Sequence, residues 1–132
     1  MIVVDASVVI DLLLDRGSGD RRFAQARWAA REPLAAPHLL DAEVGHALRR
    51  SVLRNLVPSS LALSALDDLA RLRLTRHPHT ALLPRAFELR DNVTMYDALY
   101  LALAEMLDAT LVTRDKALGR IPGVEARVEV IA

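Results

Sequence analysis

The first five residues place an acid directly after a short apolar run. Residues 1–4 are Met, Ile, Val and Val, and Asp5 follows them. Such a run predicts a buried strand, and parallel α/β sheets bind ligands beyond the carboxyl ends of their strands. The arrangement recurs near the other terminus, where residues 110–112 predict a strand and Asp115 lies just past it. Both carboxylates are therefore expected at the same edge of one sheet.

Short apolar runs alternate with amphipathic segments along the whole chain. Strands are expected over residues 1–4, 34–36, 72–77, 110–112 and 128–131. Helices are expected over residues 7–14, 21–31, 59–71, 81–90 and 94–107, and a helix of about twenty residues is expected to begin at Pro37. This alternation predicts one α/β domain, residues 1–132, in which helices cover both faces of a central parallel sheet.

Composition excludes several kinds of site. The 132 residues include no cysteine, which excludes a disulfide framework, a thiolate nucleophile and a cysteine-based zinc site and fits a reducing cytoplasm. No apolar run approaches the ~18 residues needed to span a membrane, and the N-terminus lacks the pattern of a secretion signal. The 17 basic and 17 acidic residues give a net charge of zero, which by itself argues against a nucleic-acid partner.

The basic residues are almost all arginine, and Lys116 is the only lysine. Arginine is the better phosphate ligand, because its planar group can donate two parallel hydrogen bonds. A GC-rich genome would produce the same excess of arginine. The composition alone therefore does not distinguish a phosphate-binding surface from codon usage.

Two further acids lie near the starts of long helical segments. Glu43 is in the first turns of the segment that follows the second strand, and Asp97 comes three residues after Thr94, the expected helix cap. Each acid also has a purely structural interpretation. Asp5 and Asp115 could cap the helix or turn that follows them. Asp97 fits a capping box, and Glu43 could be a solvated acid of a first helical turn.

Taken together, the four acids indicate a divalent metal site. Mg²⁺ and Mn²⁺ are hard cations that bind carboxylate oxygens and water, and a bound cation relieves the repulsion among clustered acids. Such a cation lowers the pKa of a bound water and stabilises charge that grows on a phosphodiester. The chain has neither a cysteine nor a Gly-x-Ser-x-Gly nucleophile elbow, which agrees with hydrolysis by an activated water.

Four short motifs contain these acids. They are Ile2-Val3-Val4-Asp5-Ala6-Ser7, Glu43-Val44 with Ala47-Leu48, Tyr96-Asp97-Ala98-Leu99-Tyr100-Leu101-Ala102-Leu103-Ala104, and Leu111-Val112-Thr113-Arg114-Asp115. In order and spacing they resemble the motifs of the PIN-domain ribonucleases, and more narrowly those of the VapC-type toxins of bacterial and archaeal toxin–antitoxin pairs. The resemblance implies a three-layer α/β/α fold, Mg²⁺- or Mn²⁺-dependent endoribonuclease activity, a homodimer, and inhibition by a small cognate antitoxin.

The resemblance also implies roles for individual residues. The family's acidic quartet, which binds metal and performs catalysis, corresponds to Asp5, Glu43, Asp97 and Asp115. Its small hydroxyl positions near the metal correspond to Ser7 and Thr113. We assign the three aspartates to metal binding, and Glu43 to a bound water or to general-base catalysis. His46 departs from the pattern, because such toxins often carry asparagine three residues after the glutamate.

Basic side chains near the four acids are candidates for RNA contact. Arg114 and Lys116 flank the last of the acids and could approach a scissile phosphate. Arg50 and Arg54 share one stripe of a helix with Glu43, since they follow it at spacings of about two and three turns. A solvated arginine face and contact with an acidic antitoxin segment are alternatives for this stripe.

The other polar and aromatic residues receive structural interpretations. Tyr96 and Tyr100 lie four residues apart and are expected in the core or at a dimer interface. The remaining acids, Asp11 and Asp41 among them, are interpreted as solvated.

Other functions also place acids at strand ends. A receiver domain normally has two acids after its first strand, and a phosphatase of the aspartyl-phosphate type has Asp-x-Asp there. Asp5 is instead followed by Ala6 and Ser7. The main alternative is a catalytically inert PIN-like module that binds RNA or protein, although a decayed site would be expected to lose one of the four acids.

Overall fold

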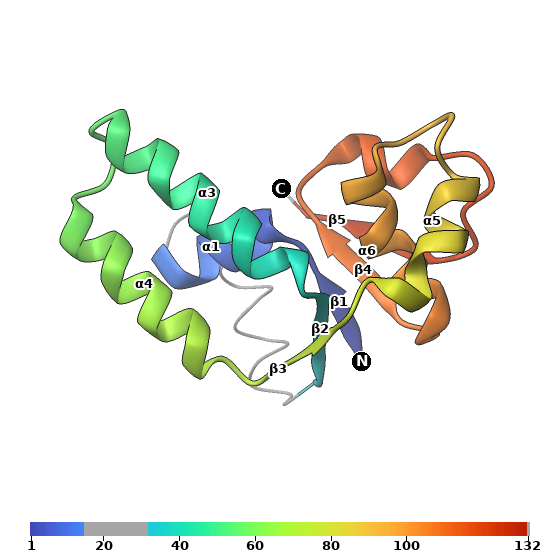
Figure 1. Ribbon diagram of the computed structural model, residues 1–132, viewed down its shortest axis with the longest axis horizontal. Coiled ribbons are helices and arrows are strands. Elements are labelled where there is room, and N and C mark those ends of the chain that lie inside the picture. The colour runs from blue at the N-terminus through green and yellow to red at the C-terminus, as the bar shows by residue number, and fades with distance from the viewer. Residues whose placement is uncertain (15–31, 132) are drawn as a thin grey trace.

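The computed structural model describes residues 1–14 and 32–131, and within them five strands form one sheet (Figure 1). The strands are β1 (Ile2–Val4), β2 (Leu34–Pro37), β3 (Leu74–His77), β4 (Thr110–Thr113) and β5 (Arg127–Val130). All four neighbouring pairs are parallel, and the order across the sheet is β3-β2-β1-β4-β5. The prediction of a central parallel sheet is confirmed.

The direction in which the chain adds strands reverses between β1 and β4. From β1 the sheet grows on one side through β2 to β3, and β4 then pairs with the opposite side of β1. In this pairing Val3 lies beside Leu111 and Val4 beside Val112, so the carboxyl ends of the two strands are adjacent. Ligands of open α/β sheets bind at such a reversal point.

Helices form a layer on each side of the sheet, so the domain is a three-layer α/β/α structure (Figure 1). The first layer contains α1 (Ala6–Leu14), α3 (Leu39–Leu53) and α4 (Ser59–Arg71), which contact one another. In the second layer α6 (Met95–Met106) packs on β1, β2 and β4, and α5 (Leu83–Glu88) packs on α6. Two short 3-10 helices, η1 (Thr80–Leu82) and η2 (Lys116–Arg120), complete the described elements.

The core is centred on the middle strands and on α6. Every residue of β1 is buried, and seven consecutive residues of α6, from Ala98 to Ala104, are buried as well. A helix that is apolar on all sides is stable only when it is surrounded by protein. The central position of α6 therefore follows from its sequence, and it fixes the first turn of this helix at the carboxyl edge of the sheet.

Several expected boundaries were wrong. Pro37 does not begin a helix of about twenty residues but ends β2, and α3 has 15 residues from Leu39. Pro37 lies opposite His77 of β3, so it ends an inner strand of the sheet rather than beginning a helix. The strand expected over residues 72–77 begins at Leu74, and the helix expected over residues 81–90 is divided between η1 and α5. The helix expected over residues 21–31 lies outside the described residues.

In the part of the chain that the structure describes, no helix has both the length and the apolar character needed to cross a membrane.

Candidate active site

The carboxylate of Asp5 joins the ends of β1 and β4. Its Oδ1 accepts hydrogen bonds from Ser7 Oγ at 2.6 Å and from the backbone N–H of Val8 at 3.2 Å, so Asp5 caps α1 as one interpretation predicted. Its Oδ2 accepts a hydrogen bond from the hydroxyl of Thr113, 108 residues further along the chain. Capping therefore uses only one oxygen of Asp5, and the other is directed toward the adjacent strand.

Thr113 connects the two aspartates that follow the central strands. Its side chain is buried, and its Oγ1 accepts a hydrogen bond from the backbone N–H of Asp115 at 3.0 Å while the hydroxyl donates to Asp5. The carboxylate of Asp115 in turn accepts a hydrogen bond from the backbone N–H of Ala117 at 2.9 Å and so caps η2. Asp115 itself is exposed. Ser7 and Thr113, expected near the acids as small hydroxyls, both bind Asp5 directly.

Asp97 lies in the first turn of α6, close to the other three acids. Thr94 Oγ1 accepts the backbone N–H of Asp97 at 3.2 Å, which is the cap that the sequence predicted. Burial raises the pKa of the Asp97 carboxyl, and the negative charges of the other three acids raise it further: Asp115, Glu43 and Asp5. The four acids therefore share one electrostatic environment at the carboxyl edge of the sheet.

Glu43 has a partner that the sequence analysis did not assign to it. Tyr100 is 1% exposed, and its hydroxyl donates to Glu43 Oε1 at 2.6 Å. The expectation of a core position is confirmed for Tyr100, but Tyr96 is 63% exposed and is not in the core. The sequence did contain a signal for this contact. Tyr100 follows Asp97 by three residues, and residues three apart on a helix lie on the same face, so Tyr100 could be expected near the acids.

The loop that carries Asp115 is tied to α1 through Arg114. The backbone N–H of Arg114 donates to Ser7 Oγ at 3.3 Å, and its guanidinium forms an ion pair with Asp11. The interpretation of Asp11 as solvated was wrong, since this residue is only 8% exposed. Asp11 follows Ser7 by one helical turn, so both face the end of β4.

Other charged residues differ in how far they are engaged. Asp41, also interpreted as solvated, accepts two hydrogen bonds from Arg76 at 2.7 and 2.9 Å and is half-buried. Three basic residues named as candidates for RNA contact are exposed: Lys116, Arg50 and Arg54. His46 is exposed on α3.

The donor set fits a hard divalent cation in its chemistry. All four clustered side chains present carboxylate oxygens, the ligands that Mg²⁺ and Mn²⁺ prefer. Over residues 1–14 and 32–131, however, no three acids or histidines are already arranged as a group that could hold one ion. Binding of one ion by these side chains would therefore require the carboxylates to move closer together, and a cation would offset their mutual repulsion.

Comparisons with known proteins identify the family. Residues 2–124 match the model of the PIN domain. The chain is 44% identical over 131 residues to Ribonuclease VapC1 of Mycobacterium tuberculosis H37Rv, covering 98% of this chain and 96% of that protein.

Solved structures show the same fold. VapBC2 from Rickettsia felis, bound to a DNA fragment from the promoter, matches over 100% of both chains with a TM-score of 0.72 and 20% identity. A toxin–antitoxin complex from Klebsiella pneumoniae matches with a TM-score of 0.64 and 23% identity, over 98% of this chain and 97% of that one. The match of residues 2–124 to the family model and the 44% identity to Ribonuclease VapC1 over nearly the full length, together with this fold, show that the chain belongs to the PIN-domain family, among the VapC-type members.

Proposed function

We propose that this chain is a Mg²⁺- or Mn²⁺-dependent endoribonuclease and the toxin of a toxin–antitoxin pair. The observation that carries the proposal is the electrostatic coupling of Asp97 to Asp5, Glu43 and Asp115 at the reversal point of the sheet. The 44% identity to a protein named Ribonuclease VapC1 supports RNA as the substrate. A carboxyl whose pKa is raised by burial and by neighbouring acids, as that of Asp97 is, is typical of a functional site.

Each acid has a proposed role in hydrolysis. Asp5, Asp97 and Asp115 would hold the cation, and Glu43 would either hold the attacking water beside the cation or accept its proton as a general base. When bound, the cation lowers the pKa of that water and offsets charge that grows on the phosphodiester. The hydroxyls of Ser7 and Thr113 fix the rotamer of Asp5 through their hydrogen bonds, which leaves less side-chain freedom to lose on binding.

Basic side chains are proposed to bind the RNA backbone. Lys116 is exposed one residue after Asp115 and can approach a phosphate beside the acids. Arg50 and Arg54 lie exposed toward the end of α3 and can contact phosphates further along the strand. Arg114 binds Asp11 in this structure, so we assign it first to holding the Asp115 loop and only second to RNA.

We also propose a small antitoxin as the protein partner and a homodimer as the assembly. The fold shared with a chain from a toxin–antitoxin complex supports the antitoxin. Exposed leucines near the junction of α3 and α4 are candidates for contact with a protein partner. They include Leu53 at the end of α3, Leu56 just after it and Leu63 on α4. An RNA substrate would place the activity in the cytoplasm.

The proposal is tested by incubating the purified, antitoxin-free protein with a mixed RNA pool in Mg²⁺, in Mn²⁺ and in chelator. We expect cleavage at defined sites with either cation and none in chelator, with restoration when the cation is added back. Cleavage that persists in chelator would contradict the metal dependence. Well-folded protein that binds RNA but cuts it under no condition would support the inert binding module instead.

A further inference from the structure

Tyr100 is buried under the four acids. It lies three residues after Asp97 on α6, and its side chain is 1% exposed. The negative charges of Glu43, Asp5 and Asp97 all act on its hydroxyl, so this group is near three members of the cluster. A buried phenol hydroxyl needs a hydrogen-bond partner. The partner in this structure is one of the acids rather than a backbone carbonyl.

The hydrogen bond runs from the tyrosine to the glutamate. Tyr100 donates to Glu43 Oε1 at 2.6 Å, a distance typical of a hydroxyl bound to an ionised carboxylate. An ionised carboxylate can only accept, so the phenol is the donor of this bond; burial first, and then this bond, raise the pKa of Tyr100 above its ordinary value. The bond joins α3 to α6 across 57 residues of sequence.

The bond restricts a flexible side chain. Glutamate has three rotatable bonds, and ordering such a long side chain costs up to about 2 kcal/mol of conformational entropy. Glu43 is half-buried on α3, and its hydrogen-bond donor, Tyr100, lies on a different helix, α6. Because the hydrogen bond from Tyr100 engages Oε1, it restricts the orientation of the whole Glu43 carboxylate.

We propose that Tyr100 is a positioning residue, whose hydroxyl holds the Glu43 carboxylate toward Asp5 and Asp97 for work on the bound substrate. This role rests on the proposed nuclease function. It also assigns the rigid, apolar α6 a task in the site beyond carrying Asp97. A tyrosine fixed in the core is suited to that task, because its ring cannot move without disturbing the packing around it.

The test compares Tyr100→Phe with Tyr96→Phe. Each variant removes one phenol hydroxyl from the same helix, but the hydroxyl of Tyr96 belongs to an exposed side chain and that of Tyr100 does not. Mn²⁺ binding is measured by electron paramagnetic resonance of the free ion, and RNA cleavage is measured on the same preparations. Circular dichroism and thermal melting establish that each variant is folded.

We expect Tyr100→Phe to weaken Mn²⁺ affinity and cleavage by about 10- to 100-fold, the range for residues that orient metal ligands. Tyr96→Phe should stay within about twofold of the wild type, since it removes no ordered contact. In a Glu43→Ala background, which removes the acceptor, Tyr100→Phe should add almost no further loss, because the two residues act as one unit.

Three results would overturn the role of Tyr100. The first is a folded Tyr100→Phe variant with wild-type Mn²⁺ affinity and cleavage. The second is an equal further loss in the Glu43→Ala background, which would mean that the hydroxyl acts independently of Glu43. The third is a wild-type protein that neither binds Mn²⁺ nor cuts RNA, and only this one would also overturn the proposed function.

Discussion

Two charged clusters in this domain are arranged in opposite ways. At the carboxyl edge of β1 and β4, burial and three neighbouring negative charges raise the pKa of Asp97. Between α5 and α6, Glu105 instead accepts two hydrogen bonds from Arg85, at 2.7 and 3.0 Å, and these lower its pKa. One cluster gathers like charges and the other pairs opposite charges.

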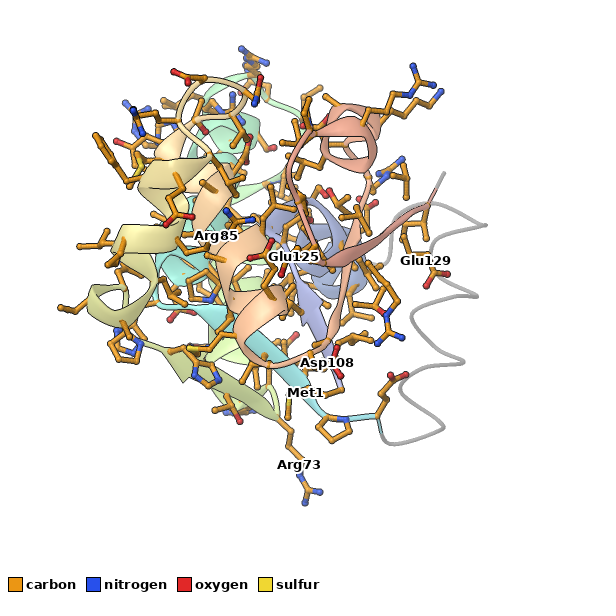
Figure 2. All side chains as sticks on the ribbon, turned by 90° about the vertical axis from the view of Figure 1, so that its right-hand side faces the viewer. Met1, Arg73, Arg85, Asp108, Glu125 and Glu129 are labelled. Carbon is orange, nitrogen blue, oxygen red and sulfur yellow. The ribbon has the colours of Figure 1, made fainter. Side chains whose placement is uncertain are left out.

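The ion pair of Arg85 and Glu105 connects α5, α6 and the loop that contains Gly123 and Glu125. Arg85 on α5 also donates to Glu88 at 2.9 Å and to the carbonyl of Gly123 at 2.7 Å. Glu105 on α6 accepts the backbone N–H of Glu125 at 2.8 Å. Figure 2 shows Arg85 and Glu125 next to each other on this side of the molecule, away from the labelled Met1. The loop between η2 and β5 is thus tied to both helices.

The difference teaches which charges serve the fold and which serve a site. Paired and hydrogen-bonded charges stabilise the native state, whereas clustered acids without a cation destabilise it. A destabilising cluster of this kind is typical of a functional site. The two clusters should therefore respond to substitution with opposite signs of stability change.

Removal of Glu105 should have the largest effect on stability. Glu105→Ala breaks both bonds to Arg85 and leaves the backbone N–H of Glu125 without its acceptor. We expect a loss of about 2–3 kcal/mol in the free energy of unfolding, measured by urea denaturation. Glu88→Ala is the matched control, because its side chain is 65% exposed and makes one bond to the same arginine. That variant should lose less than about 0.5 kcal/mol.

The pH dependence of stability should report the same pair. The pKa of Glu105 is lowered in the folded state from its ordinary value of 4.5, mainly by the hydrogen bond from Arg85. The stability that the ionised Glu105 contributes is therefore fully present above about pH 4.5, the pKa in the unfolded state. It is lost as the pH falls through the lower pKa of the folded state. The stability difference between the wild type and Glu105→Gln should be constant at neutral pH and should shrink in acid. A difference that grows in acid would contradict the assignment.

Removal of Arg114 should have a smaller effect. The sequence indicated Arg114 as a candidate for RNA contact, and the structure also pairs its guanidinium with the buried Asp11. We expect Arg114→Ala to lower the unfolding free energy by about 1–2 kcal/mol, because a buried acid loses a partner. Lys116→Ala, an exposed change two residues away, should leave stability within about 0.5 kcal/mol. Equal stability of the two variants would show that the ion pair contributes nothing.

Local features of the sequence predicted most of the fold and the acids of the site. Strand periodicity placed Asp5 and Asp115 past the ends of two strands, and capping chemistry placed Asp97 at the start of α6. These predictions succeeded because each depends on residues close together in the chain. Pro37 failed as a helix start, because proline is also compatible with extended backbone, and here it is the last residue of β2.

Partners that are distant in the sequence were the part that could not be predicted. Tyr100 and Glu43 are 57 residues apart, and Arg114 and Asp11 are 103 apart. Only the strand order, with β4 beside β1, brings the second pair together. Asp11 follows Ser7 by four residues, so both lie on the same face of α1. The burial of Asp11 could therefore have been predicted from the expected position of Ser7 near the acids.

The Asp97→Asn variant tests most directly whether the acidic cluster is maintained for catalysis, with RNA cleavage and thermal stability measured on the same preparation. Asparagine has nearly the same shape but cannot carry the charge that Asp115, Glu43 and Asp5 oppose. We predict that cleavage in Mg²⁺ or Mn²⁺ is lost, while the unfolding temperature without added metal equals or exceeds that of the wild type. An active variant, or one destabilised as much as Glu105→Ala, would contradict the claim that this cluster is maintained for catalysis at the expense of stability.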